Sequence, residues 1–475
     1  MFVSQGKDTL DLRDTALGRP RPERSGSGDA VASTPRVAVV GFGYIGSCLG
    51  AALAERGARV VALDSDASLI DDLRAGRCRT PEPGMAEALG AVARAGRVRF
   101  TTDYDALSDV DVVVITVGTP VAADGTLLTG QLAAVCRELA PRLRRGQLVI
   151  LRSTVAPGVT RTLVVPLLQE SGLVEGEGFG VAYCPERLAE GDALAQVREL
   201  PVVVGGCSAE SGAAAADFWR RALGVEVQTV ASVDVAEIVK LATNWWIDAN
   251  IAIANELARF CSAYGVDVLD VVAAANSLPK GSGNVNVLLP SVGVGGACLT
   301  KDPWMTWQAA QRRGVQLRTI ETARRVNDDM PGFACRLIGD GLAKLGKDLD
   351  GARVAVLGVA FKNDTGDLRR TPVQGVVDGL RAGGAEVRLF DPMADASAIR
   401  EVFRCWPAAG LAEAVDGADA VAVLAGHRDF HAIDLDWLRD AVAMPCLMFD
   451  GRMYWPADTV RRIRRLGFGF CGIGR

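Results

Sequence analysis

The sequence predicts an α/β protein with two doubly wound domains joined by a long central helix and a helical middle domain. Residues 36–64 and 353–391 share one pattern, which is a short β-branched strand, a glycine turn, a helix, a glycine and a second strand ending in an acid. Between them, residues 232–265 have the length and spacing of a single helix. A chain of 475 residues is long enough for about three domains, and its 53 glycines suit many tight turns.

The expected boundaries follow from these elements. We expect a disordered leader at 1–35, a first α/β domain at 36–230, a helical middle domain at 231–345 and a second α/β domain at 346–475. The leader carries charges throughout and lacks the apolar core of a secretory signal. Short apolar runs predict further buried strands within DVVVITVG, QLVILRST and FGVAYCPE of the first domain, and within ADAVAVLAG and PCLMFDGR of the second.

The central helix is expected to begin at a polar cap, either Ser232 or Asp234. Lys240, Asn244 and Asp248 recur at intervals of four residues, so they share one helix face. A solvated stripe is the ordinary interpretation of such a pattern. The remainder of the helix is strongly apolar, however, which favours a buried helix in a dimer interface with its polar line facing a cleft.

Composition restricts the classes of partner and chemistry. The formal net charge of -5 argues against a nucleic-acid or anionic-membrane surface, and no apolar run approaches the ~18 residues needed to span a bilayer. Eleven cysteines without paired spacing favour reduced thiols in the cytoplasm over a disulfide framework. With only His427 and His431 as histidines and no Cys-x-x-Cys pattern, no metal site is expected. Acid–base chemistry therefore falls to Asp, Glu, Lys or water.

A glycine fingerprint, Gly41-Phe42-Gly43-Tyr44-Ile45-Gly46, lies between the first predicted strand and its helix. Gly41 allows the tight turn, Gly43 lets the backbone approach a pyrophosphate, and Gly46 lets the helix pack closely. Asp64 closes the second strand 23 residues after Gly41, where its carboxylate can bind a ribose 2′-hydroxyl and repel a 2′-phosphate. The first domain is therefore predicted to be Rossmann-like and to bind NAD in preference to NADP.

The second unit retains only part of this fingerprint. It has Gly358 and Ala360 but no third glycine, and ten additional residues separate its turn from Asp391. The charged residues in this stretch are Lys362, Asp364, Asp367, Arg369 and Arg370. A degenerate fingerprint with added cations indicates a second Rossmann-like domain recruited for another phosphorylated ligand, such as a nucleotide diphosphate. A purely structural lobe with a charged loop would give the same pattern.

Eight motifs occur in order along residues 36–475: VGFGYIG (40–46), TVGTP (116–120), STVAPGVT (153–160), CPERLAEG (184–191), KLATN (240–244), GVGGACLTKDP (293–303), VAFKNDTGDLRRTP (359–372) and DGR (450–452). With these motifs the chain resembles the UDP-glucose/GDP-mannose dehydrogenase family, the nucleotide-sugar dehydrogenases, and is most similar to its UDP-N-acetylmannosamine members. The resemblance implies an NAD-dependent, four-electron oxidation of the C6 alcohol of a UDP-sugar to the uronate, with two NAD+ consumed in turn.

Cys298 matches the nucleophile of that family. Once a first oxidation gives an aldehyde, a thiolate can add to form a thiohemiacetal, which a second oxidation converts into a thioester that water hydrolyses. Most of the other ten cysteines suit the role of small buried hydrophobes. The adjacent Gly295 and Gly296, and an aspartate four positions later at Asp302, distinguish Cys298 from them.

The resemblance also implies roles for other side chains. Lys240 would stabilise a developing alkoxide, and Asn244 would hold a water. Asp302 and Glu186 would activate water and move protons during hydrolysis of the thioester. Residues expected near the nicotinamide, its ribose or elsewhere along the cofactor are Thr154, Glu190, Lys301, Thr119, Tyr44, Ile45 and Arg369. Residues expected at the UDP-sugar are Arg187, Leu188, Gly295 and Lys362.

Several positions depart from the family pattern. The CPER motif and Asp302-Pro303-Trp304 favour a UDP-N-acetylhexosamine, such as UDP-N-acetylmannosamine, over UDP-glucose. Ile247 and Asn284 stand where relatives usually carry arginine, and Ala297 replaces a residue that is often histidine or serine. The alternatives are a UDP-glucose 6-dehydrogenase, a two-electron NAD-dependent hydroxyacid dehydrogenase, and a catalytically idle NAD-binding scaffold. The number of NADH released per sugar separates the four-electron, two-electron and idle classes.

Overall fold

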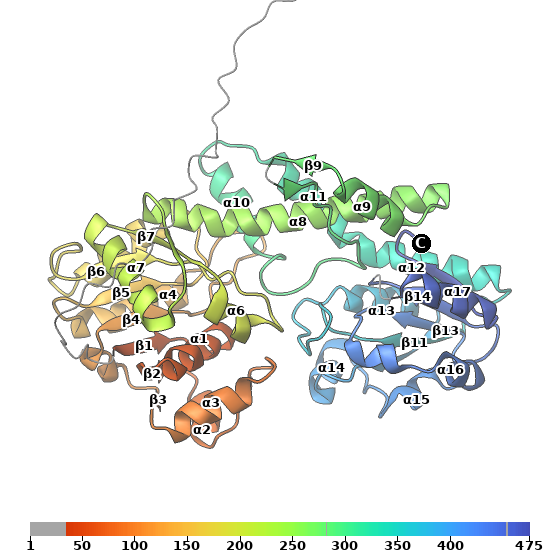
Figure 1. Cartoon of the computed structure of the whole chain (residues 1–475), viewed down its shortest axis with the longest axis horizontal. Helices are drawn as coiled ribbons and strands as arrows, with labels where there is room; N and C mark the ends of the chain where they lie inside the picture. Colours follow the sequence, from red (N-terminus) through yellow and green to blue (C-terminus); the bar gives the residue numbers. More distant parts are fainter. Residues whose placement is uncertain (1–34, 282, 453–454) are drawn as a thin grey trace, which may run out of the picture. The chain divides into compact units, whose positions relative to one another are not determined.

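The predicted fold class is confirmed: two doubly wound α/β domains are separated along the chain by a helical middle (Figure 1). The structure is a computed structural model and describes residues 35–281, 283–452 and 455–475. The expected leader at 1–35 lies outside the described residues except for Pro35. Among the described residues, no helix combines the length and the hydropathy needed to cross a bilayer.

The first sheet contains eight strands within the described residues: β1 Arg36–Val40, β2 Arg59–Leu63, β3 Val98–Thr101, β4 Val112–Ile115, β5 Leu148–Leu151, β6 Gly180–Tyr183, β7 Val202–Gly206 and β8 Val227–Thr229. Their order is β3-β2-β1-β4-β5-β6-β7-β8, and only the β6–β7 pair is antiparallel. The first six strands have the Rossmann order, which places a ligand crevice at the carboxyl ends of β1 and β4. Strands β3, β7 and β8 lie outside the predicted set, and β3 and β8 are short and only partly buried, so their apolar pattern is weak.

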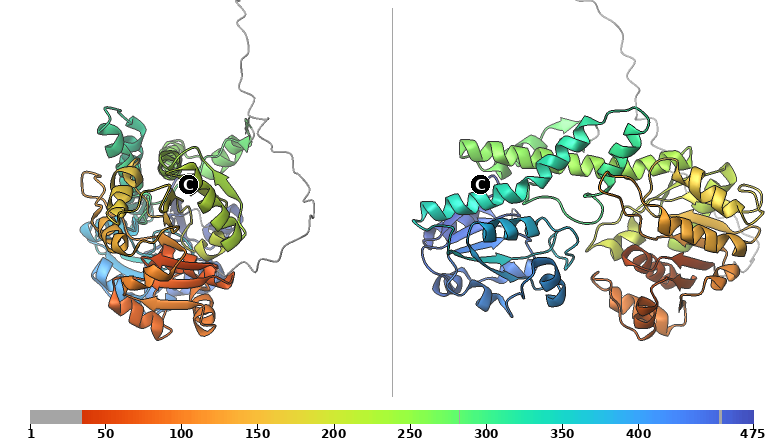
Figure 2. Two further views of the ribbon diagram at one scale, coloured as in Figure 1. Left: turned by 90° about the vertical axis from the view of Figure 1, so that its left-hand side faces the viewer. Right: turned by 180° about the vertical axis from the view of Figure 1, so that it is seen from behind.

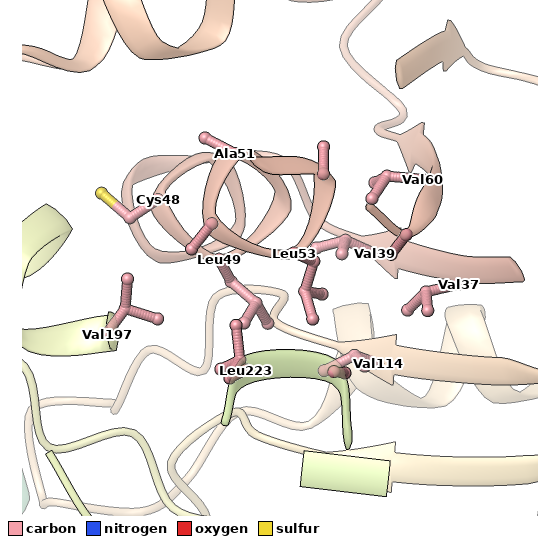
Figure 3. Close-up of a cluster of buried hydrophobic side chains, with 14 of the residues drawn as sticks. Val37, Val39, Cys48, Leu49, Ala51, Leu53, Val60, Val114, Val197 and Leu223 are labelled. Carbon is pink, nitrogen blue, oxygen red and sulfur yellow. The ribbon is translucent and has the colours of Figure 1, made fainter. Parts of the chain in front are cut away.

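The first domain is held together by apolar layers on both faces of this sheet. Figure 3 shows Leu49 and Leu53 of α1 (Tyr44–Glu55) directed toward the sheet strands that carry Val39 and Val114, with Leu223 close by. All five side chains are fully or almost fully buried. The other helices of this domain are α2 Ala67–Arg74, α3 Met85–Arg94, α4 Gly130–Leu139, α5 Val165–Gln169, α6 Ala193–Glu199 and α7 Ala209–Leu223.

The central helix α8 (Val233–Tyr264) is 32 residues long and ends where the sequence predicts. Of the two predicted caps, Ser232 is the residue used, and its hydroxyl accepts a hydrogen bond from the backbone N–H of Val235. Gly265 ends the helix in the left-handed conformation, with φ of 65°. The rest of the middle comprises α9 Val268–Asn276, β9 Pro279–Lys280, β10 Gly283–Asn284, α10 Asp302–Gln311, α11 Arg318–Asp328 and α12 Met330–Lys344. Helix α11 packs along α8 (Figure 2).

The polar line of α8 does not face a single cleft as expected. Lys240 and Asn244 lie at the candidate site described below, but Asp248 is bonded to α11. Its carboxylate accepts from Arg324 at 2.7 Å and from Asn327 at 2.9 Å, and all three side chains are buried. Each four-residue step rotates the helix face by about 40°, so the third member of the line turns toward the neighbouring helix.

The second sheet contains five parallel strands within the described residues: β11 Arg353–Leu357, β12 Glu386–Phe390, β13 Ala420–Val423, β14 Leu447–Asp450 and β15 Gly469–Gly472. Their order, β12-β11-β13-β14-β15, is the flavodoxin-like doubly wound order, with its switch point between β11 and β13. The helices of this domain are α13 Val373–Ala382, α14 Ala396–Phe403, α15 Leu411–Val415, α16 Leu435–Ala441 and α17 Ala457–Arg465.

We expect Asp248→Ala to lower the free energy of unfolding by about 3 kcal/mol, because it leaves the buried guanidinium of Arg324 without its buried counterion. Urea unfolding measures the change. Glu321→Ala is the matched control, since it removes the partner of Arg325 from an exposed pair on the same helix α11. The control should cost less than about 0.5 kcal/mol. Equal, small effects of the two substitutions would contradict the prediction.

Candidate active site

The glycine fingerprint forms the tight turn between β1 and α1 that the sequence predicts. Gly41 has φ of 89°, a conformation that favours glycine. A Cβ at Gly46 would lie 2.1 Å from the carbonyl oxygen of Gly41, whereas a Cβ at Gly43 would meet nothing within 4 Å. The backbone is therefore open at Gly43, where a pyrophosphate must approach closely. Asp64, at the end of β2, accepts a hydrogen bond of 2.7 Å from the backbone N–H of Phe42 and so also orders the turn.

A buried carboxylate that the sequence analysis did not single out ties this turn to the CPERLAEG segment. Glu82 is bonded to the hydroxyl of Tyr44 and accepts 2.8 Å and 3.1 Å hydrogen bonds from the backbone N–H groups of Gly191 and Leu194. Burial and the bond to Glu82 raise the pKa of Tyr44 above its usual range. Glu82 lies between two prolines in a polar stretch, so no periodic pattern marks it.

Two threonines meet at the carboxyl ends of β4 and β5. The hydroxyl of Thr119 donates a 2.6 Å hydrogen bond to the backbone carbonyl of Thr154. The segment after Thr154 is held by Glu237 of α8, whose carboxylate accepts from the backbone N–H groups of Gly158 and Thr160 at 2.5 Å and 2.9 Å. These bonds fix the STVAPGVT motif against the central helix, immediately before the turn of α8 that carries Lys240.

The loop that carries Cys298 packs tightly because it contains glycines. A Cβ at Gly295 would lie 2.6 Å from the Cβ of Phe361, and a Cβ at Gly296 would lie 2.9 Å from the Phe361 ring. After Cys298 the chain turns at once into a helix: the carbonyl of Cys298 accepts from the backbone N–H groups of Lys301 and Asp302 at 3.0 Å and 2.8 Å. Helix α10 then begins at Asp302.

Five predicted polar side chains gather around this loop. The ammonium of Lys240 lies 3.5 Å from a carboxylate oxygen of Glu186. Asn244 donates a 2.6 Å hydrogen bond to Asp302, whose second oxygen lies 2.6 Å from the ammonium of Lys301. Asp302 is fully buried, and Lys240 and Asn244 are buried as well, so these charges interact in a medium less polar than water.

The charges act on the thiol in opposite directions. Burial raises the pKa of Cys298 to about 12; Lys240 lowers it, while Asp302 and Glu186 raise it further. Burial lowers the pKa of Lys240, but Glu186 and Cys298 outweigh this effect and the net direction is upward. At neutral pH, Lys240 is therefore an ammonium and Cys298 a protonated thiol.

Arg152 is a buried cation beside this cluster that the sequence analysis did not identify. Its guanidinium lies over the ring of Trp219, 5.1 Å from the ring centroid, and its Nε and Nη1 have no hydrogen-bond partner. Burial lowers its pKa, and the charge of Glu186 opposes that shift. Arg152 immediately follows an apolar strand, and only three-dimensional proximity to Glu186 reveals its relevance.

Residues of the second domain reach the first at Glu190. Lys362 donates a 2.9 Å hydrogen bond to the backbone carbonyl of Glu190, and Arg369 lies 3.4 Å from its carboxylate. Arg369 also lies over the ring of Tyr44, at 5.8 Å from the centroid. Burial raises the pKa of Glu190, and Arg369 opposes the rise.

Two cavities adjoin these contacts. One of about 650 Å³ is lined by the fingerprint turn and by residues 366–370 of the second domain. The other, of about 360 Å³, is lined by the Cys298 loop and by the second domain; its lining includes Gly295, Phe361, Lys362 and Arg452. Arg452, from the DGR motif, had no role assigned from the sequence. Its guanidinium donates to the backbone carbonyls of Leu424 and Phe361.

Most of the predicted residues are therefore linked by hydrogen bonds, ion pairs or packing contacts. The side chains of Arg187 and Leu188 are the two exceptions. Arg187 directs its guanidinium to the backbone carbonyl of Pro201, and Leu188 contributes its backbone N–H to Glu186 rather than a side-chain contact. Ile45 is partly exposed in the fingerprint turn. Within the described residues, no group of three or more His, Cys, Asp or Glu side chains is arranged to hold a metal ion.

Comparison with known proteins agrees with the motifs. Three domains of the UDP-glucose/GDP-mannose dehydrogenase family match the chain: the NAD binding domain at residues 35–223, the central domain at 234–329 and the UDP binding domain at 355–457. A UDP-N-acetyl-D-mannosamine dehydrogenase of Pyrococcus horikoshii is 32% identical over 440 residues, which cover 93% of this chain and 99% of the relative.

Two further comparisons show the range of relatives. A UDP-glucose 6-dehydrogenase of Haloferax volcanii is 32% identical over 428 residues, covering 88% of this chain and 96% of the relative. A solved structure of the UDP-D-ManNAc dehydrogenase from Pyrococcus horikoshii superposes with a TM-score of 0.82 at 31% identity, covering 93% of this chain and 99% of the other.

The chain therefore belongs to the UDP-glucose/GDP-mannose dehydrogenase family. It is a nucleotide-sugar dehydrogenase, an NAD-dependent oxidoreductase, as the resemblance of its motifs implied. The open backbone at Gly43 and the carboxylate at the end of β2 fit NAD, the cofactor of the matched domain.

We expect the rate of Cys298 alkylation by iodoacetamide to rise about tenfold per pH unit between pH 7 and pH 10, because only the thiolate reacts and the pKa lies near 12. Lys240→Met should slow the reaction at every pH, since the ammonium lowers the pKa of this thiol. Lys280→Met, at an exposed lysine of β9, is the control. Mass spectrometry of the Cys298 peptide gives the rate, and a plateau below pH 9 would disprove the expectation.

Proposed function

We propose that this protein oxidises the C6 alcohol of a UDP-N-acetylhexosamine, such as UDP-N-acetylmannosamine, to the uronate in a four-electron reaction. The observation that carries the proposal is the position of Cys298 beside the buried ammonium of Lys240 and the carboxylates of Asp302 and Glu186. The CPER motif and the relative from Pyrococcus horikoshii support the choice of sugar. UDP-glucose is the second candidate, supported by the relative from Haloferax volcanii.

Two binding regions are proposed from the contacts described above. When bound, NAD supplies the hydride acceptor for both oxidation steps. The residues proposed to hold it are Gly41, Gly43, Tyr44, Ile45, Gly46, Asp64, Thr119, Thr154, Glu190, Lys301 and Arg369. Those proposed for the UDP-sugar are Gly295 and Lys362, with Arg187 and Leu188 from the first domain, and we add Arg452 because it lines the same cavity as Gly295 and Lys362.

Lys240 and Asn244 act on the sugar oxygen in this proposal. The ammonium of Lys240 stabilises the negative charge that develops on the C6 oxygen as its proton leaves. Asn244, bonded to Asp302, orients a water or the substrate hydroxyl beside that carboxylate. Both side chains are buried and project from successive turns of α8, so they are positioned before the substrate arrives.

Cys298 then carries the intermediate. Its sulfur forms a bond to the aldehyde carbon while the carbonyl oxygen takes up a proton, giving a thiohemiacetal. Loss of a hydride from the same carbon and of the hydroxyl proton gives a thioester. Water adds to the thioester carbon, the carbon–sulfur bond breaks, and the thiol leaves protonated. Asp302 and Glu186 accept and return the protons of these steps.

The two-electron hydroxyacid dehydrogenase is less well supported. Such an enzyme needs neither a nucleophilic thiol nor a UDP binding domain. Here, the thiol has an ammonium and two carboxylates around it, and the UDP binding domain matches residues 355–457. The cytoplasmic location inferred from the cysteines stays a prediction.

We also propose a homodimer formed through α8. Trp246, Ile253 and Phe260 recur every seven residues along this helix and are 51%, 57% and 62% exposed, a large apolar surface for one helix face. A second copy of the chain is the occupant that a symmetric, self-complementary helix face fits. Sedimentation velocity at micromolar concentration tests this; Phe260→Glu should shift the protein toward monomer, and a wild-type monomer would contradict the proposal.

The function is tested by measuring NADH formation with a panel of UDP-sugars. We expect two NADH and one sugar acid per UDP-N-acetylhexosamine consumed, and far weaker turnover with NADP+, because Asp64 repels a 2′-phosphate. UDP-glucose as the better substrate would select the second candidate. One NADH per sugar would reject the four-electron reaction.

Cys298→Ser is the diagnostic arm of the same experiment. A hydroxyl ionises far less readily than a thiol, so the variant should release sugar acid at least about 100-fold more slowly, while the first oxidation persists or an adduct accumulates. Intact-mass measurement after incubation detects the adduct. Cys78→Ser, a partly buried cysteine of the first domain, is the matched control and should retain activity. Wild-type turnover of Cys298→Ser would exclude the thiol as nucleophile.

A further inference from the structure

One of the two histidines of the chain is buried at the switch point of the second sheet. His427 follows β13, and it is fully buried. The segment 358–364 follows β11, the neighbouring strand, so both segments emerge at the same carboxyl edge. This is the position at which doubly wound sheets bind their ligands.

Both ring nitrogens of His427 are in use. Nδ1 accepts a 2.9 Å hydrogen bond from the backbone N–H of Asp364, so this nitrogen carries no proton. Nε2 lies 2.9 Å from a carboxylate oxygen of Asp391 and must then carry the proton and donate it. The ring is thus a neutral bridge of fixed tautomer between the end of β12 and the loop after β11.

Asp391 anchors the other side of the bridge. It stands at the end of β12, as Asp64 stands at the end of β2, but its carboxylate is fully occupied within the protein. It accepts 2.7 Å and 2.9 Å hydrogen bonds from the backbone N–H groups of Val359 and Met393, besides the bond from His427. Burial raises the pKa of Asp391, but His427 and the backbone amides outweigh this effect, and the net shift is downward.

The loop that His427 contacts needs such restraint. Asp364 has φ of 56°, an unfavourable conformation for a residue with a side chain. Its carboxylate accepts from the backbone N–H of Arg428 at 2.8 Å and from the side chain of the same arginine at 3.0 Å. The preceding Asn363 accepts a 2.8 Å hydrogen bond from the backbone N–H of Gly426. Four hydrogen bonds therefore join the segment after β13 to this loop. In only one of them, from the backbone N–H of Asp364 to Nδ1 of His427, is the partner a buried aromatic ring.

The same loop reaches the candidate active site. Phe361, Lys362 and Asn363 line the cavity of about 360 Å³ next to the Cys298 loop. Phe361 packs against Gly295 and Gly296, and Lys362 donates to the backbone carbonyl of Glu190 in the first domain. A shift of Asp364 therefore changes the wall of the cavity and the contact on the nucleophile's loop together.

We propose that His427 is a positioning residue for the UDP-sugar: its unprotonated Nδ1 holds the backbone of Asp364 and thereby sets the places of Phe361 and Lys362 in the cavity. His427 itself does not contact the substrate in this arrangement. The inference rests on the proposed function only in assigning the cavity to the nucleotide sugar. The interaction that matters is the single acceptor at Nδ1, and the bond to Asp391 serves to orient the ring.

Three variants separate these contributions. His427→Asn places an amide oxygen near the position of Nδ1, and His427→Gln places an amide group near the position of Nε2. His427→Phe fills the same space without any hydrogen-bonding group. We expect His427→Phe and His427→Gln to weaken UDP binding, measured by calorimetry, and to raise KM for the UDP-sugar about tenfold, the effect of leaving one buried N–H unpaired. His427→Asn should stay within about threefold of wild type. In all three, kcat and the KM for NAD+ should change less than twofold.

The controls address folding and the proposed function. Thermal unfolding identifies any variant that does not fold. If His427→Phe does not fold, the comparison of His427→Asn with His427→Gln, two similar amides, still tests the inference. His431→Asn, at the exposed second histidine, should behave as wild type. Equal UDP affinity and KM in all variants, or equal losses in the Asn and Gln variants, would overturn the inference. A wild-type protein that binds UDP but oxidises no UDP-sugar would refute the proposed function. The UDP affinities of the His427 variants would still test the positioning role of His427 in that case.

Discussion

The close approach of two glycines to one aromatic ring is the constraint on which the candidate active site depends. Because Gly295 and Gly296 have no Cβ, the loop before Cys298 lies directly against Phe361 of the second domain. At its other end, the loop enters α10, whose first residue, Asp302, is bonded to Asn244 of α8. Cys298 is therefore fixed by the second domain on one side and by the central helix on the other. A side chain at either glycine would displace Phe361 and separate the two.

Elements determined by neighbouring residues could be predicted from the sequence. The turn at Gly41 and the two ends of α8 depend on conformations and caps that a few adjacent residues specify, and they occur as expected. The candidate catalytic cluster is different, because Glu186, Lys240 and Cys298 are far apart in the chain and meet only after folding. No local pattern predicts that these residues share one site. That prediction comes from the order of the motifs and their resemblance to a known family.

Isolated buried polar residues could not be predicted. Glu82 and Arg152 occur singly, one between prolines and one after an apolar strand, so neither produces a periodic signal.

Asp248 shows the limit of helical spacing: a four-residue repeat places side chains on one face over two turns, but the drift of that face turns the third toward another helix. The same holds for β3 and β8, whose partly exposed residues lack the apolar alternation that marks a strand.

The carboxylate of Asp391 has a consequence for any redesign of the second domain. The two α/β domains share a strand-turn-helix-strand beginning, and each places an acid at the end of its second strand. Both acids accept hydrogen bonds from backbone amides, but in the first domain the acid lies beside an open glycine turn, whereas in the second it also accepts a bond from a buried imidazole. Restoring the missing glycine after Gly358 would therefore not recreate a dinucleotide site. In the second domain the acid orients His427, which holds the loop after β11, so opening this turn to a dinucleotide would require replacing the histidine as well.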